Sequence, residues 1–146
     1  ARVGVQTFLP YPSFTESASV LDDRRLGNQR NEALVIYKTL TGQYTGRGGW
    51  PNHPCTKMWR GFEPALAAYF NTIAAEWVKR GFKNSHPQLY TASRPVMPHW
   101  LGVKNFHDSH KSALLRKNQA WYSRFSWNVP IDLPYVWPSP FSRGEI

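Results

Sequence analysis

The segment from Glu63 to Arg80 constrains the fold more than any other part of the sequence. Its apolar residues recur at the three- and four-residue spacings of one helix face. Pro64 suits the first turn, and Gly81 follows as a stop signal. Burying the larger of these side chains contributes roughly 1.5–3 kcal/mol each. The pattern therefore predicts a core helix whose buried face consists of Leu66, Tyr69, Phe70, Ile73, Ala74, Trp77 and Val78.

Three further segments have helical signals. Ser13 and Glu16 form a capping-box pattern, which predicts a helix that begins at Phe14. This helix continues, or restarts at Asp22–Asp23, and runs to Leu40, with Ala33, Ile36, Tyr37 and Leu40 on its buried face. Residues 54–59 suit a short helix opened by a proline, and residues 108–117 suit a third long helix that extends toward Tyr122.

Glycine and proline divide the rest of the chain. Residues 41–54 and 82–98 are predicted loops, and four prolines between residues 128 and 146 disfavour regular structure there. We expect a mainly α fold, a single compact domain of about three principal helices with long loops. Residues 1–127 would form this domain, and residues 128–146 a proline-rich tail packed on its surface.

The charge balance points to an anionic partner. The chain of 146 residues carries 18 Lys+Arg against 9 Asp+Glu, a formal charge of +9. Aromatic residues make up 15% of it, many beside basic ones, a pairing suited to base stacking. Neither an apolar stretch long enough for a membrane span nor a signal peptide is found. A single cysteine, Cys55, suits a reducing compartment. We expect a cytoplasmic, monomeric protein that binds nucleic acid.

The segment from Asp22 to Glu32 is the strongest functional candidate. It concentrates three arginines, three carboxylates and an amide pair on one stretch of predicted helix. Arginine binds phosphates or carboxylates bidentately, so the segment suits a binding or catalytic wall. The alternative is a solvated helix face with ion pairs between neighbouring turns.

The histidines allow several interpretations. His107 and His110 stand one helical turn apart, and His53 and Cys55 flank Pro54. Four such residues could hold zinc, but compact metal-ligand spacing is lacking, so no metal or other cofactor is predicted. His53 would contact a substrate or orient another side chain, and the other two would contact phosphate. Each could instead be a hydrogen-bonded structural histidine.

The first residue offers a nucleophile. The α-amine of a chain terminus has a pKa near 7.7–8.0, well below that of lysine, so a useful fraction is neutral at pH 7. Such an amine can attack a sugar carbon or an aldehyde. If Ala1 is the terminus, its amine is a candidate catalytic group.

In order along the chain, several segments resemble the pyrimidine-dimer DNA glycosylase family of the endonuclease V type. The match runs over residues 1–127: the arm Ala1–Val5, the arginine-rich helix of residues 21–30, the helix end at residues 77–82, and the aromatic cluster of residues 121–125. A bacterial branch of the superfamily shares the strings Arg-Leu-Gly-x-Gln-Arg, Trp-x-Asn-His-Pro and Lys-Met-Trp-Arg-Gly.

The resemblance implies a DNA glycosylase of base-excision repair, with or without AP-lyase activity. The Ala1 amine would attack C1′ of a damaged nucleotide in double-stranded DNA, expel the base and form an imine, and β-elimination would then cut the strand. The family's catalytic glutamate aligns with Arg25, so the carboxylate must come from elsewhere. Glu32, seven residues along the same helix face, is the first candidate and Asp23 the second. Glu32 could equally be an ion-pair partner of Arg25.

The candidate site residues follow from the resemblance and the charge pattern. The catalytic candidates are Ala1, Asp23, Arg25 and Glu32. The DNA-binding candidates are Arg2, Arg24, Gln29, Arg30, His53, Lys57, Arg60, His107, His110, Lys111, Arg116, Lys117, Trp121, Tyr122 and Arg124, with Phe125 beside the aromatic pair. Two alternatives stay open: an enzyme that hydrolyses a different modified base without strand cleavage, and a non-catalytic nucleic-acid-binding module.

Overall fold

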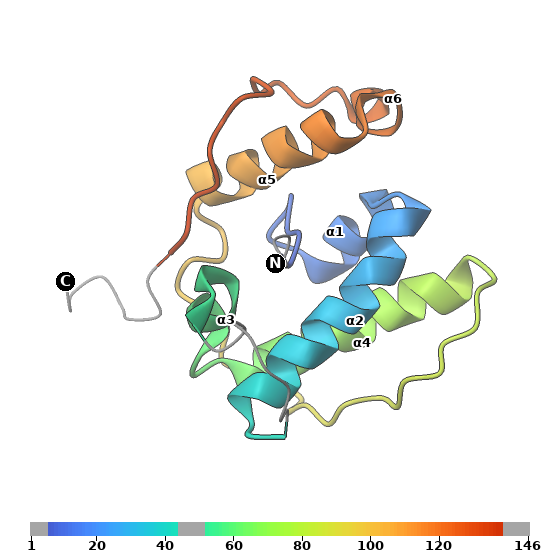
Figure 1. Cartoon of the computed structure of the whole chain (residues 1–146), viewed down its shortest axis with the longest axis vertical. Helices are drawn as coiled ribbons and strands as arrows, with labels where there is room; N and C mark the ends of the chain where they lie inside the picture. Colours follow the sequence, from blue (N-terminus) through green and yellow to red (C-terminus); the bar gives the residue numbers. More distant parts are fainter. Residues whose placement is uncertain (1–5, 44–51, 139–146) are drawn as a thin grey trace.

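The computed structural model describes residues 6–43 and 52–138, and these form a helical fold (Figure 1). No strand occurs among them. The expectation of a mainly α fold with three principal helices is confirmed, since α2, α4 and α5 are much the longest. The helices are α1 (Phe14–Val20), α2 (Asp23–Leu40), α3 (Pro54–Trp59), α4 (Glu63–Lys79), α5 (Lys104–Lys117) and α6 (Gln119–Tyr122), followed by the 3₁₀ turn η2 (Ser123–Phe125).

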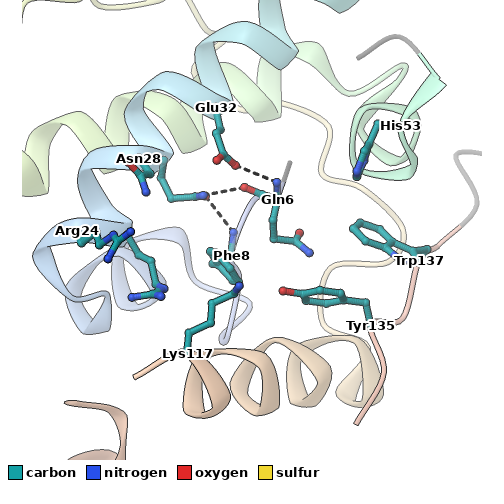
Figure 2. Close-up of a pocket in the computed structure, with 11 residues that line it drawn as sticks. Gln6, Phe8, Arg24, Asn28, Glu32, His53, Lys117, Tyr135 and Trp137 are labelled. Carbon is teal, nitrogen blue, oxygen red and sulfur yellow. Dashed lines mark hydrogen bonds between the residues drawn. The ribbon is translucent and has the colours of Figure 1, made fainter. Parts of the chain in front are cut away.

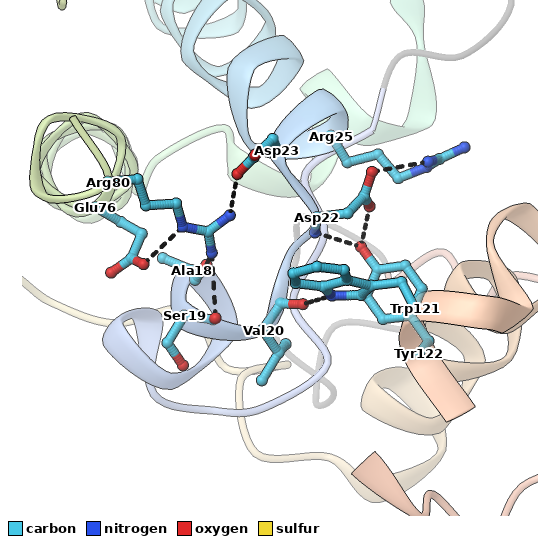
Figure 3. A network of polar contacts seen from close by, with 10 residues as sticks. All are labelled: Ala18, Ser19, Val20, Asp22, Asp23, Arg25, Glu76, Arg80, Trp121 and Tyr122. Carbon is cyan, nitrogen blue, oxygen red and sulfur yellow. Dashed lines mark hydrogen bonds and ion pairs between the residues drawn. The ribbon is translucent and has the colours of Figure 1, made fainter. Parts of the chain in front are cut away.

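Of the two alternatives for residues 14–40, the restart is confirmed, because the helix is divided at Leu21 and Asp22. Both residues have extended backbone, and Asp22 is the N-cap of α2. The Arg80 guanidinium donates to the carbonyls of Ala18 and Ser19, which stabilises the end of α1 (Figure 3). The Tyr122 hydroxyl accepts a hydrogen bond from the Asp22 backbone N–H at 3.0 Å. Tertiary partners therefore fix the break.

Helix α5 begins at Lys104, four residues before the expected start at Asp108. Gly102, with φ of 98°, makes the turn that precedes it. The Gly102 N–H donates to Nε2 of His107 at 2.8 Å. This bond, made by a side chain of the first turn, lets the helix start without a recognisable N-cap residue.

The core lies where α2 and α1 pack on α4. Leu66, Tyr69, Phe70 and Ile73 of α4 are fully buried, as the spacing predicted. Val78 is 53% exposed, so the predicted buried face ends one turn early. Large aromatic side chains, among them Trp59, Trp100 and Phe106, fill the space between these helices and α5. None of the helices within the described ranges is both long and apolar enough to cross a membrane.

Gly27 allows α2 to approach the indole ring of Trp77. A Cβ atom at residue 27 would lie 2.9 Å from Cη2 of that ring. The ring is held in place, because it stacks on Phe82 at 4.1 Å between centroids, carries the Arg30 guanidinium at 4.7 Å, and donates to the Lys83 carbonyl.

We expect Gly27→Ala to lower the free energy of unfolding by about 1 kcal/mol. Overpacking costs roughly 1–3 kcal/mol, and the better helix propensity of alanine returns up to about 1 kcal/mol. Urea unfolding measures the difference. In a Trp77→Phe background the smaller ring leaves room, and the same substitution should become neutral or stabilising. Equal costs in both backgrounds would contradict this explanation.

The N-terminal arm, residues 6–10, runs between α2 and α5. Leu9 is held by two histidines of α5, since its N–H donates to Nδ1 of His110 at 2.8 Å and its carbonyl accepts from His107 at 2.7 Å. Gln29 of α2 accepts from the Phe8 N–H and donates to the Gln6 carbonyl, at 3.0 and 2.7 Å. Side chains thus supply the hydrogen bonds that a neighbouring strand would give.

Residues 128–138 lie along α5 without regular structure (Figure 1). The Arg116 guanidinium donates to the carbonyls of Ile131 and Leu133, at 2.7 and 3.0 Å. The hydroxyl of Ser112 accepts from the Leu133 N–H. That of Ser109 accepts from the Val136 N–H. The division into a domain of residues 1–127 and a tail of residues 128–146 stays a prediction.

Candidate active site

A pocket of about 390 Å³ opens between the arm, α2, α5 and the tail (Figure 2). Each of these four parts contributes side chains, and one more comes from the residue before α3. The lining residues are Gln6, Phe8, Arg24, Arg25, Asn28, Gln29, Glu32, His53, Lys117, Tyr135 and Trp137.

Glu32 is the acid of this pocket. Its Oε1 accepts a hydrogen bond from the Gln6 backbone N–H at 2.9 Å, which ties α2 to the arm. Burial raises the pKa of the Glu32 carboxyl from 4.5 to about 7, although the Gln6 bond and the Lys117 charge lower it in part. A carboxyl that titrates near neutrality can both give and take a proton at physiological pH.

The raised pKa also makes stability depend on pH. The folded state holds the Glu32 proton more tightly than the unfolded state, so stability falls as pH rises from about 4.5 to about 7. We expect Glu32→Gln to remove this loss and to be about 1–3 kcal/mol more stable than the wild type at pH 8, but not at pH 4.5. Urea unfolding of both proteins at the two pH values measures this, and a difference independent of pH would contradict it.

Cations surround the acid. Arg24 is exposed at the rim, and Arg25 forms an ion pair with Asp22 at 3.2 Å rather than with Glu32. Lys117 ends α5 at the same rim, and the pKa of its ammonium is lowered by burial and then by Arg25 and Arg116. The opening is therefore positive, which favours a phosphate there.

Asp23, the second acid candidate, does not line the pocket. Its carboxylate pairs with Arg80 at 2.9 Å, and its side chain is 61% exposed (Figure 3). Arg30 also lies elsewhere, because it donates to Asn84 at 2.7 Å and covers Trp77. Arg25 and Glu32, seven residues apart on α2, both line the pocket, as their spacing on one helix face predicted.

Three residues expected to contact DNA are buried inside the protein instead. His107 and His110 are 4% and 0% exposed, and their ring nitrogens bind the arm backbone. Tyr122 is fully buried, and its hydroxyl makes a short hydrogen bond to Asp22. Gln29, also buried, holds the arm while one edge borders the pocket. These polar groups satisfy buried partners, which is why they are inside.

His53 makes a structural hydrogen bond and also lines the pocket, while its contact with a substrate stays a prediction. Its Nδ1 accepts from the Cys55 N–H at 3.0 Å and so caps α3, while its ring lines the pocket beside Trp137. Burial lowers the pKa of the imidazole, which favours the neutral form. Within the described ranges, no three His, Cys, Asp or Glu side chains are grouped as metal ligands would be.

The other DNA-binding candidates lie outside the pocket lining. Lys57 and Arg60 are exposed at α3, and Arg124 covers Trp121, whose indole donates to the Val20 carbonyl (Figure 3). Lys111 lies over Tyr11. Ala1 and Arg2 fall outside the described residues. Arg116 holds the tail, as described above, and the DNA contacts of the whole set stay predictions.

Sequence reasoning missed five lining residues. Gln6 and Phe8 belong to the arm, and Asn28 was counted in the amide pair of the arginine-rich helix but was not named as a site residue. Tyr135 and Trp137 belong to the proline-rich tail. The two aromatic residues amid prolines were the available signal, since rings in a segment without regular structure need a surface to pack on.

A family model, pyrimidine dimer DNA glycosylase, matches residues 5–89. No curated protein and no solved structure matches the chain. The matched span is shorter than the resemblance suggested, because α5 and the aromatic cluster lie beyond it. It includes the arm, the acid and most of the positive rim, while Lys117, Tyr135 and Trp137 are outside it. With more than half of its length matched and its acid inside that span, the chain belongs to the pyrimidine dimer DNA glycosylase family.

Proposed function

We propose that this pocket removes a damaged pyrimidine from double-stranded DNA, with Glu32 as the proton donor and acceptor. The observation that carries the proposal is a half-buried carboxyl with a pKa of about 7 inside a positively charged pocket. Membership of a DNA glycosylase family supplies the substrate, which is DNA. Turning a nucleotide out of the duplex costs a few kcal/mol, and less at a lesion.

The proposed nucleophile is the α-amine of Ala1. Gln6, five residues later, is bonded to Glu32, and an extended chain spans at most about 3.6 Å per residue. Five residues of extended chain reach at most about 18 Å. Because the Gln6 N–H binds Glu32 directly, this reach is compatible with attack by the terminus beside the acid.

The proposed reaction balances with one acid. The amine nitrogen bonds to C1′, the bond between C1′ and the base breaks, and the base leaves with the electron pair and receives a proton from neutral Glu32. The nitrogen gives one proton to the Glu32 carboxylate. The C1′–O4′ bond then breaks, O4′ leaves with the electron pair and receives that proton from Glu32, and the nitrogen lone pair forms the protonated imine. The Glu32 carboxylate removes a C2′ proton, and the C3′–O bond breaks with the 3′-phosphate as the leaving group, which cuts the strand.

We propose that Arg24, Arg25 and Lys117 hold the phosphates beside the extruded nucleotide. Arg24→Ala should weaken binding to duplex DNA and lower the slope of log K against log salt by roughly 0.9, the value for one phosphate contact. Lys79→Ala, which removes an exposed cation outside this pocket, is the control and should leave the slope unchanged. A salt titration by fluorescence anisotropy measures both. Equal slopes for the two variants would contradict the contact.

The experiment that tests the function is trapping with borohydride. The protein is incubated with a duplex that contains a thymine dimer or an abasic site, reduced, and digested for mass spectrometry. A covalent adduct on the residue-1 peptide is expected, and acetylation of the terminus should abolish it. Free base with an intact strand and without an adduct would favour hydrolysis instead of the imine. Salt-sensitive binding without chemistry on any duplex would leave only a binding module.

A further inference from the structure

The tail closes one side of the pocket with two aromatic rings. Tyr135 and Trp137 lie 5.3 Å apart between centroids, and both line the space opposite Glu32 (Figure 2). Both residues lie outside the span that the family model matches. We infer that they form a stacking wall for the base of the extruded nucleotide, and that Gln6 donates a hydrogen bond to a ring carbonyl of that base. This inference rests on the proposed function.

Hydrogen bonds to α5 fix the position of this stacking wall. Arg116 binds two carbonyls of the tail, and the hydroxyls of Ser109 and Ser112 bind two of its N–H groups. The Tyr135 ring packs on His110 of α5 at 5.9 Å. A base that enters the pocket therefore meets rings that are already ordered, so stacking does not carry the full entropy cost of fixing them.

Trp137 has aromatic surface to offer. It is 37% exposed, and its contact with His53 at 5.7 Å is edge-on, at an interplanar angle of 82°. Neither of these described partners stacks on it in parallel, so among the described residues a ring face is left for a planar ligand. Bases bind proteins by such stacking without regard to sequence.

Gln6 provides a hydrogen-bond donor to the same pocket. The side chain is 3% exposed and lines the pocket. Its Oε1 accepts from the Thr7 N–H at 3.0 Å, and because a backbone N–H can only donate, the amide orientation is fixed. Nε2 makes no hydrogen bond of normal geometry among the described residues, and the Gln6 side chain lies close enough to the Tyr135 hydroxyl to lower the pKa of that group in part. A buried donor without an acceptor is unfavourable, and a ligand carbonyl would satisfy it.

These two features fit a keto pyrimidine. A donor from Gln6 needs an acceptor on the base, and the ring carbonyls of thymine, uracil and cytosine supply one. The stacking wall accepts any planar ring. The contacts to the base would therefore come from an arm residue and a tail segment rather than from the arginine-rich helix.

The test compares Trp137→Ala with Trp137→Phe. The control is Tyr90→Ala, which removes an aromatic ring that is 86% exposed and outside the pocket. For each we measure the single-turnover rate of base release and the affinity for damaged and undamaged duplexes. Trp137→Ala should lose roughly 5- to 150-fold in release rate and in affinity for damaged DNA, with unchanged affinity for undamaged DNA. Trp137→Phe should stay within about threefold, because its ring still stacks. Thermal unfolding checks that each variant folds.

Gln6→Glu tests the donor. It keeps an oxygen for the Thr7 N–H but replaces Nε2 with an acceptor, so base release should fall more than tenfold while binding to undamaged DNA persists. Full activity of both Trp137→Ala and Gln6→Glu would overturn the inference, as would equal weakening of damaged and undamaged binding. A wild-type chain that releases no base from any lesion-bearing duplex would overturn the proposed function instead.

Discussion

Replacing Glu32 with glutamine is expected to lower the single-turnover rate of base release by roughly 10²–10⁴-fold, the usual contribution of a general acid–base group. Glutamine still accepts the Gln6 N–H, so the pocket keeps its shape, but it cannot exchange a proton. In the wild type the rate should change with an inflection near pH 7, where the carboxyl titrates. Quenched-flow or gel assays on a duplex with a thymine dimer measure the rate.

Asp23→Asn is the matched control. This carboxylate belongs to the same helix but pairs with Arg80 away from the pocket, so its loss should leave the rate within a few-fold of wild type. DNA affinity should be kept in both variants. A Glu32→Gln protein that keeps its full rate would remove Glu32 from the mechanism. A large loss from Asp23→Asn alone would move the acid to the second candidate.

Gln29→Leu is expected to destabilise the protein by about 2–5 kcal/mol. The substitution leaves the Phe8 N–H and the Gln6 carbonyl buried without their partner, and it removes an acceptor that lies 2.5 Å from the Tyr69 hydroxyl. Each buried group without a partner costs roughly 1–3 kcal/mol. Urea unfolding at neutral pH measures the loss, and base release should fall with it, because the arm that binds Glu32 loses two of its hydrogen bonds to α2.

Asn28→Leu provides the comparison for this stability change. Asn28 precedes Gln29 on α2 but is exposed, so the substitution should alter the free energy of unfolding by no more than about 0.5 kcal/mol. Similar costs at the two positions would mean that helix α2, rather than the bonds to the arm, sets the penalty.

The helices were predictable because their signals are local. The period of α4 and the proline at the start of α3 identify those elements from a few neighbouring residues, and the structure has them at Glu63–Lys79 and Pro54–Trp59. Glu32 was predictable for the same reason, since a seven-residue spacing on one helix places it on the face of Arg25. The break at Asp22 depended on Tyr122, one hundred residues away.

The remaining site residues depend on such distant contacts. Histidines one turn apart look the same in sequence whether they face DNA or the backbone of Leu9, and only the folded arm shows that His107 and His110 do the latter. The wall made by Tyr135 and Trp137 requires the tail to return along α5. Local sequence patterns do not tell which surface the arm or the tail packs against.

The path of the arm has a consequence for the order of folding. Leu9 finds its partners on α5, at residues 107 and 110, and the junction before α2 finds its partners at Trp121 and Tyr122. Contacts between distant parts of a chain form slowly. The bonds from the arm to Gln29 and Glu32 join residues only 21 to 26 positions apart, so they can form before α5 has been translated. The pocket is complete only after α5 and the tail have joined it.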